Sequence, residues 1–169
     1  DSDKTATTKI HIGAKLDFKG FIKAGIDFIY EKCIKEGPTD NVNSGDDTKI
    51  GSSGYGAQIG SSGYGAQIGS SGDGAKIGSS GDGAQIGSSG YGAKIGSSGY
   101  GAKIGSSGYG AQIGSSGDLA KIESEGNNAV VAAIGIDSKI KAKKGSWITL
   151  AEYGEDLKPV CVRSAQIDG

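Results

Sequence analysis

Small or apolar residues alternate with polar ones at a fixed phase of nine through the middle of the chain. From residue 51 to residue 122 the sequence reads as eight consecutive copies of the unit G-S-S-G-[YD]-[GL]-A-[QK]-I. The seventh position is always Ala and the ninth is always Ile, with Gln or Lys between them. This alternation predicts a short β-strand in every unit, with the seventh and ninth positions facing inward.

The remainder of the unit, G-S-S-G and the variable fifth position, is typical of a turn. Gly adopts positive φ at little cost, and Ser hydroxyls bond to nearby backbone. One such strand buries too little surface to be stable alone, so the units must stack. We therefore expect an all-β fold, a parallel β-solenoid in which two units make one coil and each unit lies over the unit two places earlier.

Degenerate units extend the same register into both flanks, over residues 42–50, 123–131, 132–140 and, more loosely, 141–149. We therefore expect the solenoid to span residues 42–149, with about twelve units or about six coils. The alternative is a disordered or elastic Gly/Ser/Tyr tract, but such tracts rarely hold Ala and Ile at a fixed phase. Towards the end of the solenoid we expect the inward residues to become larger, namely Val130, Val131, Ile134, Ile136 and Ile140.

Residues 1–41 have a different period. Residues 5–12 alternate as a strand, and apolar residues then recur at helical spacing up to Gly37-Pro38. The open end of a solenoid exposes its core and a row of unpaired strand groups. We therefore expect residues 1–41 to form an N-terminal cap containing an amphipathic helix. The alternative is a helix that binds a membrane surface or a partner.

The C-terminal residues predict a β-hairpin. Residues 147–153 and 160–167 have strand character and are joined by G-E-D-L-K-P. We expect residues 147–169 to cap the second end of the solenoid. A cluster of lysines precedes the hairpin, and we interpret it as a solvated edge that resists strand pairing rather than as a polyanion site. These are Lys139, Lys141, Lys143 and Lys144.

Composition and charge narrow the classes of function. The 169 residues include 33 Gly and 35% hydrophobic residues, which suit a solenoid better than a conventional globular core. The net charge is −1, without the basic excess typical of nucleic-acid binding. No run approaches the ~20 apolar residues of a membrane span. Because the chain contains no Met and no signal-peptide core, we expect a processed form or a fragment.

Candidate catalytic chemistry is sparse. His11 is the sole histidine, so a zinc cluster or a Cys-His pair lacks parts. Cys33 and Cys161 lie in opposite flanks, and we expect both to be free thiols. Nucleotide-binding glycine motifs are absent from the sequence. Glu152 and the acidic pair at 155–156 fit the composition of a hairpin turn, so we expect no enzyme and no cofactor.

The fifth position of the repeat also argues against a metal. Calcium-binding nonapeptides follow G-G-x-G-x-D-x-U-x, whereas here Asp occupies the fifth position in three of the eight regular units. We therefore expect no metal site. Ice binding requires a flat and mostly uncharged array, and the outward lysines argue against it.

Tyrosines at the fifth position are the candidate binding residues. With two units per coil, Tyr55, Asp73, Tyr91 and Tyr109 would stack along one edge and Tyr64, Asp82, Tyr100 and Asp118 along the other. Stacked aromatic rings on a rigid edge supply contact area at low entropic cost. The alternative is that the stacking only stiffens the turns. The predicted binding residues are Tyr55, Tyr64, Tyr91, Tyr100 and Tyr109.

The outward Gln and Lys residues are interpreted as two solvated faces that resist aggregation. One face would carry Gln58, Lys76, Lys94 and Gln112, and the other Lys49, Gln67, Gln85, Lys103 and Lys121.

The flanks resemble a largely uncharacterised family of phage- and prophage-associated proteins with C-terminal nonapeptide repeats. The resemblance is carried by T-T-K-I-H-I-G-A-K-L-D-F-K-G-F-I-K before the repeats, by N-N-A-V-V-A-A-I-G-I-D-S-K-I-K-A-K-K-G-S-W-I-T-L-A-E-Y after them, and by the final I-D-G. That family has a further N-terminal module that this chain lacks. The run A-V-V-A-A-I-G-I-D-S-K is also similar to head repeats of trimeric autotransporter adhesins, as an analogy of fold.

These features predict a non-enzymatic repeat scaffold that presents a regular surface for protein binding. The resemblance implies that a phage or prophage encodes it and that it acts against a host system in the bacterial cytoplasm. The alternative is a structural or adhesive fibre subunit outside the cell, which self-associates into a homo-oligomer through solenoid ends or edges. An enzyme dependent on His11 or Glu152 is the third class.

Overall fold

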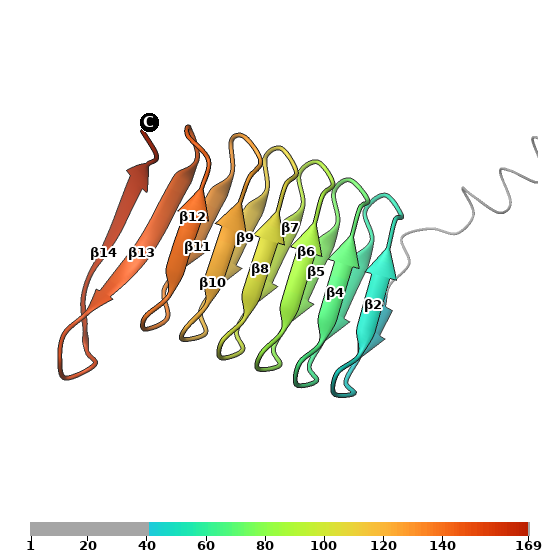
Figure 1. Ribbon diagram of the computed structural model, residues 1–169, viewed down its shortest axis with the longest axis horizontal. Helices are drawn as coiled ribbons and strands as arrows, with labels where there is room; N and C mark the ends of the chain where they lie inside the picture. Colours follow the sequence, from blue (N-terminus) through green and yellow to red (C-terminus); the bar gives the residue numbers. More distant parts are fainter. Residues whose placement is uncertain (1–40, 169) are drawn as a thin grey trace, which may run out of the picture. The chain divides into compact units, whose positions relative to one another are not determined.

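The computed structural model of the protein describes residues 41–168. These residues form a parallel β-solenoid of about six turns with two sheets stacked face to face along its axis (Figure 1). From β1 to β13 successive strands alternate between the sheets, so each sheet grows by one strand per coil. The prediction of an all-β solenoid is therefore confirmed.

Sheet A has eight strands and sheet B has six. The strands of sheet A are β1 (Asn41–Asn43), β3 (Gln58–Ser61), β5 (Lys76–Ser79), β7 (Lys94–Ser97), β9 (Gln112–Ser115), β11 (Val130–Ala133), β13 (Trp147–Tyr153) and β14 (Pro159–Gln166). The strands of sheet B are β2 (Lys49–Ser52), β4 (Gln67–Ser70), β6 (Gln85–Ser88), β8 (Lys103–Ser106), β10 (Lys121–Ser124) and β12 (Lys139–Ala142).

The parallel pairing confirms the predicted coil of two units. Ile77 of β5 is in register with Ile59 of β3 and Ile95 of β7, and each step covers 18 residues. The turns between strands continue the ladder, because Gly74 N–H donates a hydrogen bond of 2.8 Å to the carbonyl of Tyr91. Both strands and turns are thus held by contacts between residues about one coil apart.

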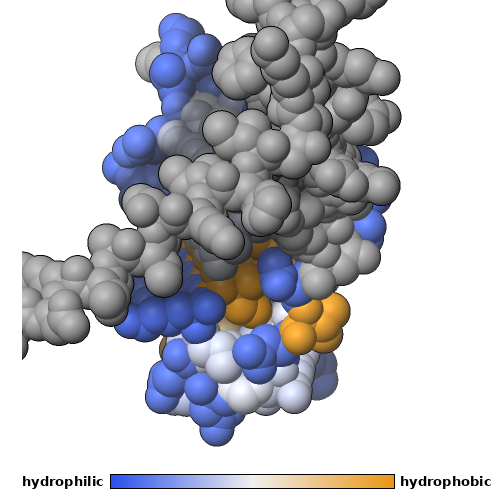
Figure 2. All heavy atoms as spheres, turned by 90° about the vertical axis from the view of Figure 1, so that its right-hand side faces the viewer, coloured by the Kyte–Doolittle hydropathy of each residue, from blue (hydrophilic) through white to orange (hydrophobic). Residues whose placement is uncertain are grey.

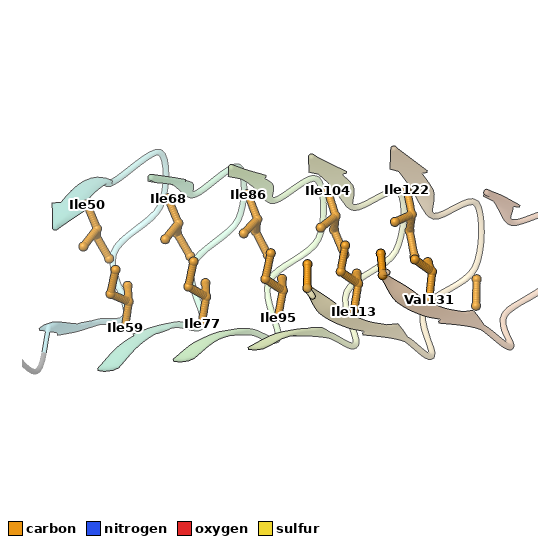
Figure 3. Packing of buried hydrophobic residues seen from close by; sticks show 13 residues of the cluster. Ile50, Ile59, Ile68, Ile77, Ile86, Ile95, Ile104, Ile113, Ile122 and Val131 are labelled. Carbon is orange, nitrogen blue, oxygen red and sulfur yellow. The ribbon is translucent and has the colours of Figure 1, made fainter. Parts of the chain in front are cut away.

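The core is a narrow double row of isoleucines between the sheets (Figure 3). Ile68 and Ile77, from facing sheets, are only 3% and 4% exposed, and Ala at the seventh position of the regular units is 0% exposed. Burying an Ile side chain stabilises by roughly 2 kcal/mol, and the row repeats this contribution in every unit. The predicted inward positions of Ala and Ile are confirmed.

The first Ser of each unit also faces inward, which the turn interpretation of G-S-S-G missed. Each strand covers positions eight, nine, one and two, so alternation buries the second position with the ninth. Ser79 and Ser97, for example, are 6% and 7% exposed. The Oγ atoms of the inward serines have no hydrogen-bond partner within the protein. These are Ser61, Ser70, Ser79, Ser88, Ser97, Ser106, Ser115 and Ser124.

The prediction of larger inward residues near the end of the solenoid is partly wrong. Val131 is fully buried and Ile140 is partly buried against the core. Val130 and Ile134, however, are 52% and 46% exposed. They occupy the eighth and third positions of their units, which strand alternation turns outward. Ile136 takes the fifth position in a turn and is half-buried.

The predicted C-terminal hairpin is confirmed, and it extends only one sheet. Strand β13 pairs in parallel with β11, and β14 pairs antiparallel with β13. Sheet B ends at β12, whose outward residues are Lys139 and Lys141. These two lysines therefore lie on an edge strand, as the edge interpretation of the cluster expected.

Hydrophilic residues lie around hydrophobic ones at the end of the solenoid where β2 lies (Figure 2). The predicted N-terminal strand over residues 5–12 and the helical cap within residues 1–41 fall outside the described residues, apart from Asn41. So do His11 and Cys33.

Candidate functional site

The turns carry the variable residues of the repeat, and a left-handed residue shapes each turn. The sixth position has positive φ in every regular unit, for example +66° at Gly65. Asp47, Asn128 and Asp137 take this conformation elsewhere, and these residue types tolerate it. Leu119 also adopts it, with φ +56°. The backbone reversal projects the fifth position outward, where the tyrosines lie.

One edge of the solenoid carries a column that we call the alternating column, because Asp and Tyr follow one another from coil to coil. Hydrogen bonds between successive turns set this order, such as Gly65 N–H to the Asp82 carbonyl and Gly83 N–H to the Tyr100 carbonyl, each 2.8 Å. Its members are Asp46, Tyr64, Asp82, Tyr100, Asp118 and Ile136.

The aspartates of the alternating column lie against the backbone of the next coil. Asp82 Oδ1 accepts a hydrogen bond of 2.8 Å from the N–H of Tyr100, and Asp118 Oδ1 accepts one of 2.8 Å from the N–H of Ile136. Asp46 accepts equivalently from the N–H of Tyr64 at 2.9 Å. The short acidic side chains are therefore held against the backbone, while the ring of Tyr64 reaches towards Gly83 of the next coil.

The opposite edge carries the stacked column, which consists of Tyr55, Asp73, Tyr91, Tyr109 and Asn127. Tyr91 and Tyr109 are neighbours in adjacent coils, and their rings stack with centroids 5.4 Å apart and planes 5° apart. The hydroxyl of Tyr109 accepts a hydrogen bond from the amide of Asn128. In this column Tyr91 and Tyr109 contact one another, and Tyr109 contacts the turn of the next coil. Asp73 Oδ1 accepts a hydrogen bond of 2.7 Å from the N–H of Tyr91, as the aspartates of the alternating column do with their own neighbours.

The structure places all five predicted tyrosines in exposed turns but divides them between the two columns. Tyr55, Tyr91 and Tyr109 lie on the stacked column, and Tyr64 and Tyr100 on the alternating column. Their exposure falls along the chain, from 83% for Tyr55 to 46% for Tyr109. The extension of the alternating column to Asp46 and Ile136 was missed, although the register of the degenerate units could have shown it.

The predicted Gln/Lys faces are present on both sheets, each beside a column of glycines. On sheet B, residues 49, 67, 85, 103, 121 and 139 form one outward column, and Gly51, Gly69, Gly87 and Gly105 begin the next. Glu123 and Lys141 continue the glycine column as an ion pair. The hydrogen bond from Lys141 to Glu123 and the negative charge of Glu123 raise the pKa of Lys141 above the ordinary lysine value.

The outward face of sheet A becomes apolar at its C-terminal end. The polar column of Gln58, Lys76, Lys94 and Gln112 continues as Val130 and then Trp147, which are register neighbours. Val130 is 52% exposed and Trp147 is 51% exposed. Val162 of β14, on the same face, is 60% exposed. Val162 lies opposite Ala151, four residues along β13 from Trp147. We call Val130 and Trp147 the apolar end patch.

Polar side chains of the hairpin pair with one another. Glu152 lies in β13, not in the turn, and its carboxylate accepts from Arg163 Nη2 and from the Cys161 thiol, each at 3.2 Å. Arg163 also donates from Nε to the Cys161 sulfur at 3.3 Å, and this hydrogen bond, with the negative charge of Glu152, raises the pKa of Arg163. Cys161 is a free thiol.

Glu155 and Asp156, the predicted acidic pair, lie in the turn between β13 and β14. Asp156 accepts from Lys158, and that hydrogen bond lowers the pKa of the Asp156 carboxyl below its ordinary value. The ion pair between Asp156 and Lys158 is exposed, as is usual for charged residues in a turn.

Among residues 41–168, no group of three or more His, Cys, Asp and Glu side chains is placed to hold a metal ion. The same part of the chain contains no helix long and apolar enough to cross a membrane.

No protein-family model, no curated protein and no solved structure matches this chain. Functional inference therefore depends on the residues and surfaces described above.

Proposed function

We propose that the protein is a non-enzymatic scaffold whose solenoid presents tyrosines to a partner protein. The observation that carries the proposal is the exposure of all five tyrosines on turns that are held coil to coil by backbone hydrogen bonds. Tyr is enriched at protein interfaces because it offers a large contact area with few rotatable bonds. A rigid backbone further lowers the entropy lost on binding.

Residue choice within the repeat supports binding over a purely structural role. Asn127 and four aspartates occupy the same turn position as the tyrosines, so the fold accepts small polar residues there. A large aromatic side chain is thus not needed to form the turn. The resemblance of the flanks to phage-associated proteins would make a protein of the bacterial host the natural partner.

The test is affinity capture from bacterial lysate with matched variants. One variant replaces all five tyrosines with Asn, which already occupies this position at residue 127. The control replaces Lys76 and Lys94 with Gln, as found at Gln58 and Gln112 in the same column. We expect the wild-type chain and the control to retain the same protein, and the five-tyrosine variant to lose it. Equal retention by all three, or no retained protein, would contradict the proposal.

The second candidate function is a structural subunit that self-associates, and the apolar end patch favours it. Exposed apolar groups at adjacent register positions commonly mark protein contacts, and Trp is frequent among residues that dominate binding energy. A second copy of the chain would cover Val130 and Trp147. Sedimentation velocity over a range of concentrations tests this, with Val130→Gln plus Trp147→Gln as the variant. Self-association that the variant abolishes would support the fibre function.

A further inference from the structure

We propose that the alternating column binds a polyproline II segment of the partner, with prolines and a basic residue repeating every third position. The inference rests on the proposed protein-binding function and specifies the partner's conformation and charge. It concerns Tyr64, Asp82, Tyr100 and Asp118.

The spacing of the column carries the inference. Tyr64 and Tyr100 are separated by two coils, which at ordinary strand spacing is about 9.6 Å. Asp82 and Asp118 are separated by the same distance. A polyproline II helix advances about 9.3 Å in each three-residue turn. The two periods differ by about 0.3 Å, so they stay in step over the length of the column.

Other peptide conformations do not match this period. Side chains on one face of a β-strand recur about every 6.7 Å. An α-helix advances about 5.4 Å per turn, so two turns exceed the tyrosine spacing by about 1.2 Å. Only the three-residue helix presents equivalent groups to both tyrosines.

The surface around the tyrosines suits proline. Tyr64 is 64% exposed and Tyr100 is 56% exposed. Gly65, Gly83 and Gly101 occupy the adjacent turn position and add no side chains. The carboxylate of Asp47 lies over Gly65, and the ring of Tyr64 reaches towards Gly83 of the next coil. Exposed aromatic rings on such a surface are what proline-rich segments dock against in known recognition domains. A polyproline II segment also loses little entropy, because it is already extended before binding.

The carboxylates of the column favour a basic segment, and Lys103 and Lys121 lie on the sheet B side of its Gly101 and Leu119. Asp46, Asp82 and Asp118 hold carboxylates in place along the column through their backbone hydrogen bonds. Asp47 and Asp137 add charge at the adjacent turn position. The carboxylates alternate with the rings, so a segment that sets its prolines against the tyrosines brings every third side chain near an aspartate. Arg fits best, since it pairs with carboxylates and stacks on tyrosine rings.

The stacked column provides an internal comparison. There Tyr91 and Tyr109 lie in adjacent coils with ring centroids 5.4 Å apart. Each ring covers one face of the other ring, and the spacing of the two centroids is close to half the period of a polyproline II helix. The same column also holds Tyr55, Asp73 and Tyr91 at the spacing of Tyr64, Asp82 and Tyr100. Because the ring of Tyr91 has one face covered by Tyr109, we expect this column to bind the segment more weakly.

The test uses a fluorescent peptide of about twelve residues that repeats Pro-Pro-Arg, with a scrambled peptide of the same composition as control. Binding is followed by fluorescence anisotropy at low and high salt. We expect saturable binding of the repeating peptide, weaker binding at high salt and at least about ten-fold weaker binding of the scrambled peptide.

Variants locate the site. Tyr64→Asn plus Tyr100→Asn should weaken binding at least about ten-fold, while Tyr64→Phe plus Tyr100→Phe should retain it through the rings. The same Asn substitutions at Tyr91 and Tyr109 should weaken binding less than those at Tyr64 and Tyr100, because Tyr109 already covers one face of Tyr91. Circular dichroism of each variant confirms that the solenoid is folded.

A deletion tests the spacing itself. In a chain that also carries Tyr55→Asn, removing residues 78–95 takes out one whole coil, including Asp82, and leaves Tyr64 and Tyr100 in adjacent coils while both rings remain. The Tyr55→Asn substitution is needed because the deletion would otherwise bring Tyr55, Asp73 and Tyr109 to the two-coil spacing in the stacked column. We expect this variant to lose binding of the repeating peptide. Retained binding, or equal loss in the variants of both columns, would overturn the inference. If a captured partner depends on Tyr91 and Tyr109 and the peptide does not bind, the inference is wrong while the protein-binding function stands.

Discussion

Gly99 lies so close to the carbonyl oxygen of Gly81, one coil earlier, that a β-carbon on Gly99 would be 2.0 Å from that oxygen. The glycine at the fourth position of most units approaches the preceding coil in the same way, for example at Gly90 and Gly126. The obstacle is backbone on both sides, so it cannot move aside as a side chain could. This contact explains why Gly126 and Gly135 keep the fourth position in the degenerate units 123–131 and 132–140, where other positions of the repeat change.

Gly99→Ala should therefore lower the free energy of unfolding by about 3 kcal/mol, because the coils must separate to admit the methyl group. The matched control is Gly96→Ala, since a β-carbon on Gly96 has nothing within 4 Å. The control should be neutral or slightly stabilising, because Ala restricts the unfolded chain. Urea denaturation followed by circular dichroism measures both. Equal effects at the two glycines would show that the coils are not packed this closely.

Leu119 takes the left-handed conformation that Gly holds in the other regular units, with φ +56°. This conformation costs a side chain such as Leu roughly 1 to 2 kcal/mol. Leu119→Asn should raise the thermal midpoint and stabilise by about 1 kcal/mol, since Asn128 adopts the same φ in its own turn. The reverse change in the preceding coil, Gly101→Leu, should destabilise by a similar amount. A stabilising Gly101→Leu would contradict the strain at this position.

The inward serines should be better replaced by Ala. Ser97 is 7% exposed, and its Oγ has no hydrogen-bond partner within the protein. Ala133 already fills the equivalent inward position, in register with Ser115. Removing a buried and unsatisfied hydroxyl should stabilise by about 1 kcal/mol.

The control for Ser97→Ala is Ser98→Ala, because Ser98 follows directly and is exposed. That change should leave the unfolding midpoint unaltered. A loss of stability on Ser97→Ala would mean that the hydroxyl contributes a favourable interaction.

Removal of one coil should preserve the fold. Deleting residues 78–95 joins Ile77 to Gly96, which is in register with Gly78 in sheet A. Stability in a stacked repeat is approximately a sum of contributions from units and their interfaces. We expect an unchanged β-sheet spectrum, a rod shorter by about 4.8 Å in X-ray scattering and a modestly lower thermal midpoint. Loss of the β-sheet spectrum would contradict the equivalence of the coils.

The candidate site was only partly predictable. The sequence predicted the two turn columns, because the fifth position recurs every nine residues and successive units lie on opposite edges. It did not show that Asp82 would bond to the backbone of Tyr100 while Tyr91 would stack on Tyr109, because those contacts depend on side-chain conformations across neighbouring coils. The exposure of Val130 and Ile134 was likewise missed, since apolar character alone suggested inward positions.

The sequence by itself determined the period, the inward placement of Ala and Ile and the two-unit coil, because strand alternation and turn chemistry act over a few adjacent residues. The tertiary structure decided that Gly99 must approach Gly81 and that the hairpin extends sheet A alone. Those outcomes depend on how one coil lies on the next and where each sheet stops. Contacts between residues 18 apart, and not the local pattern, establish both.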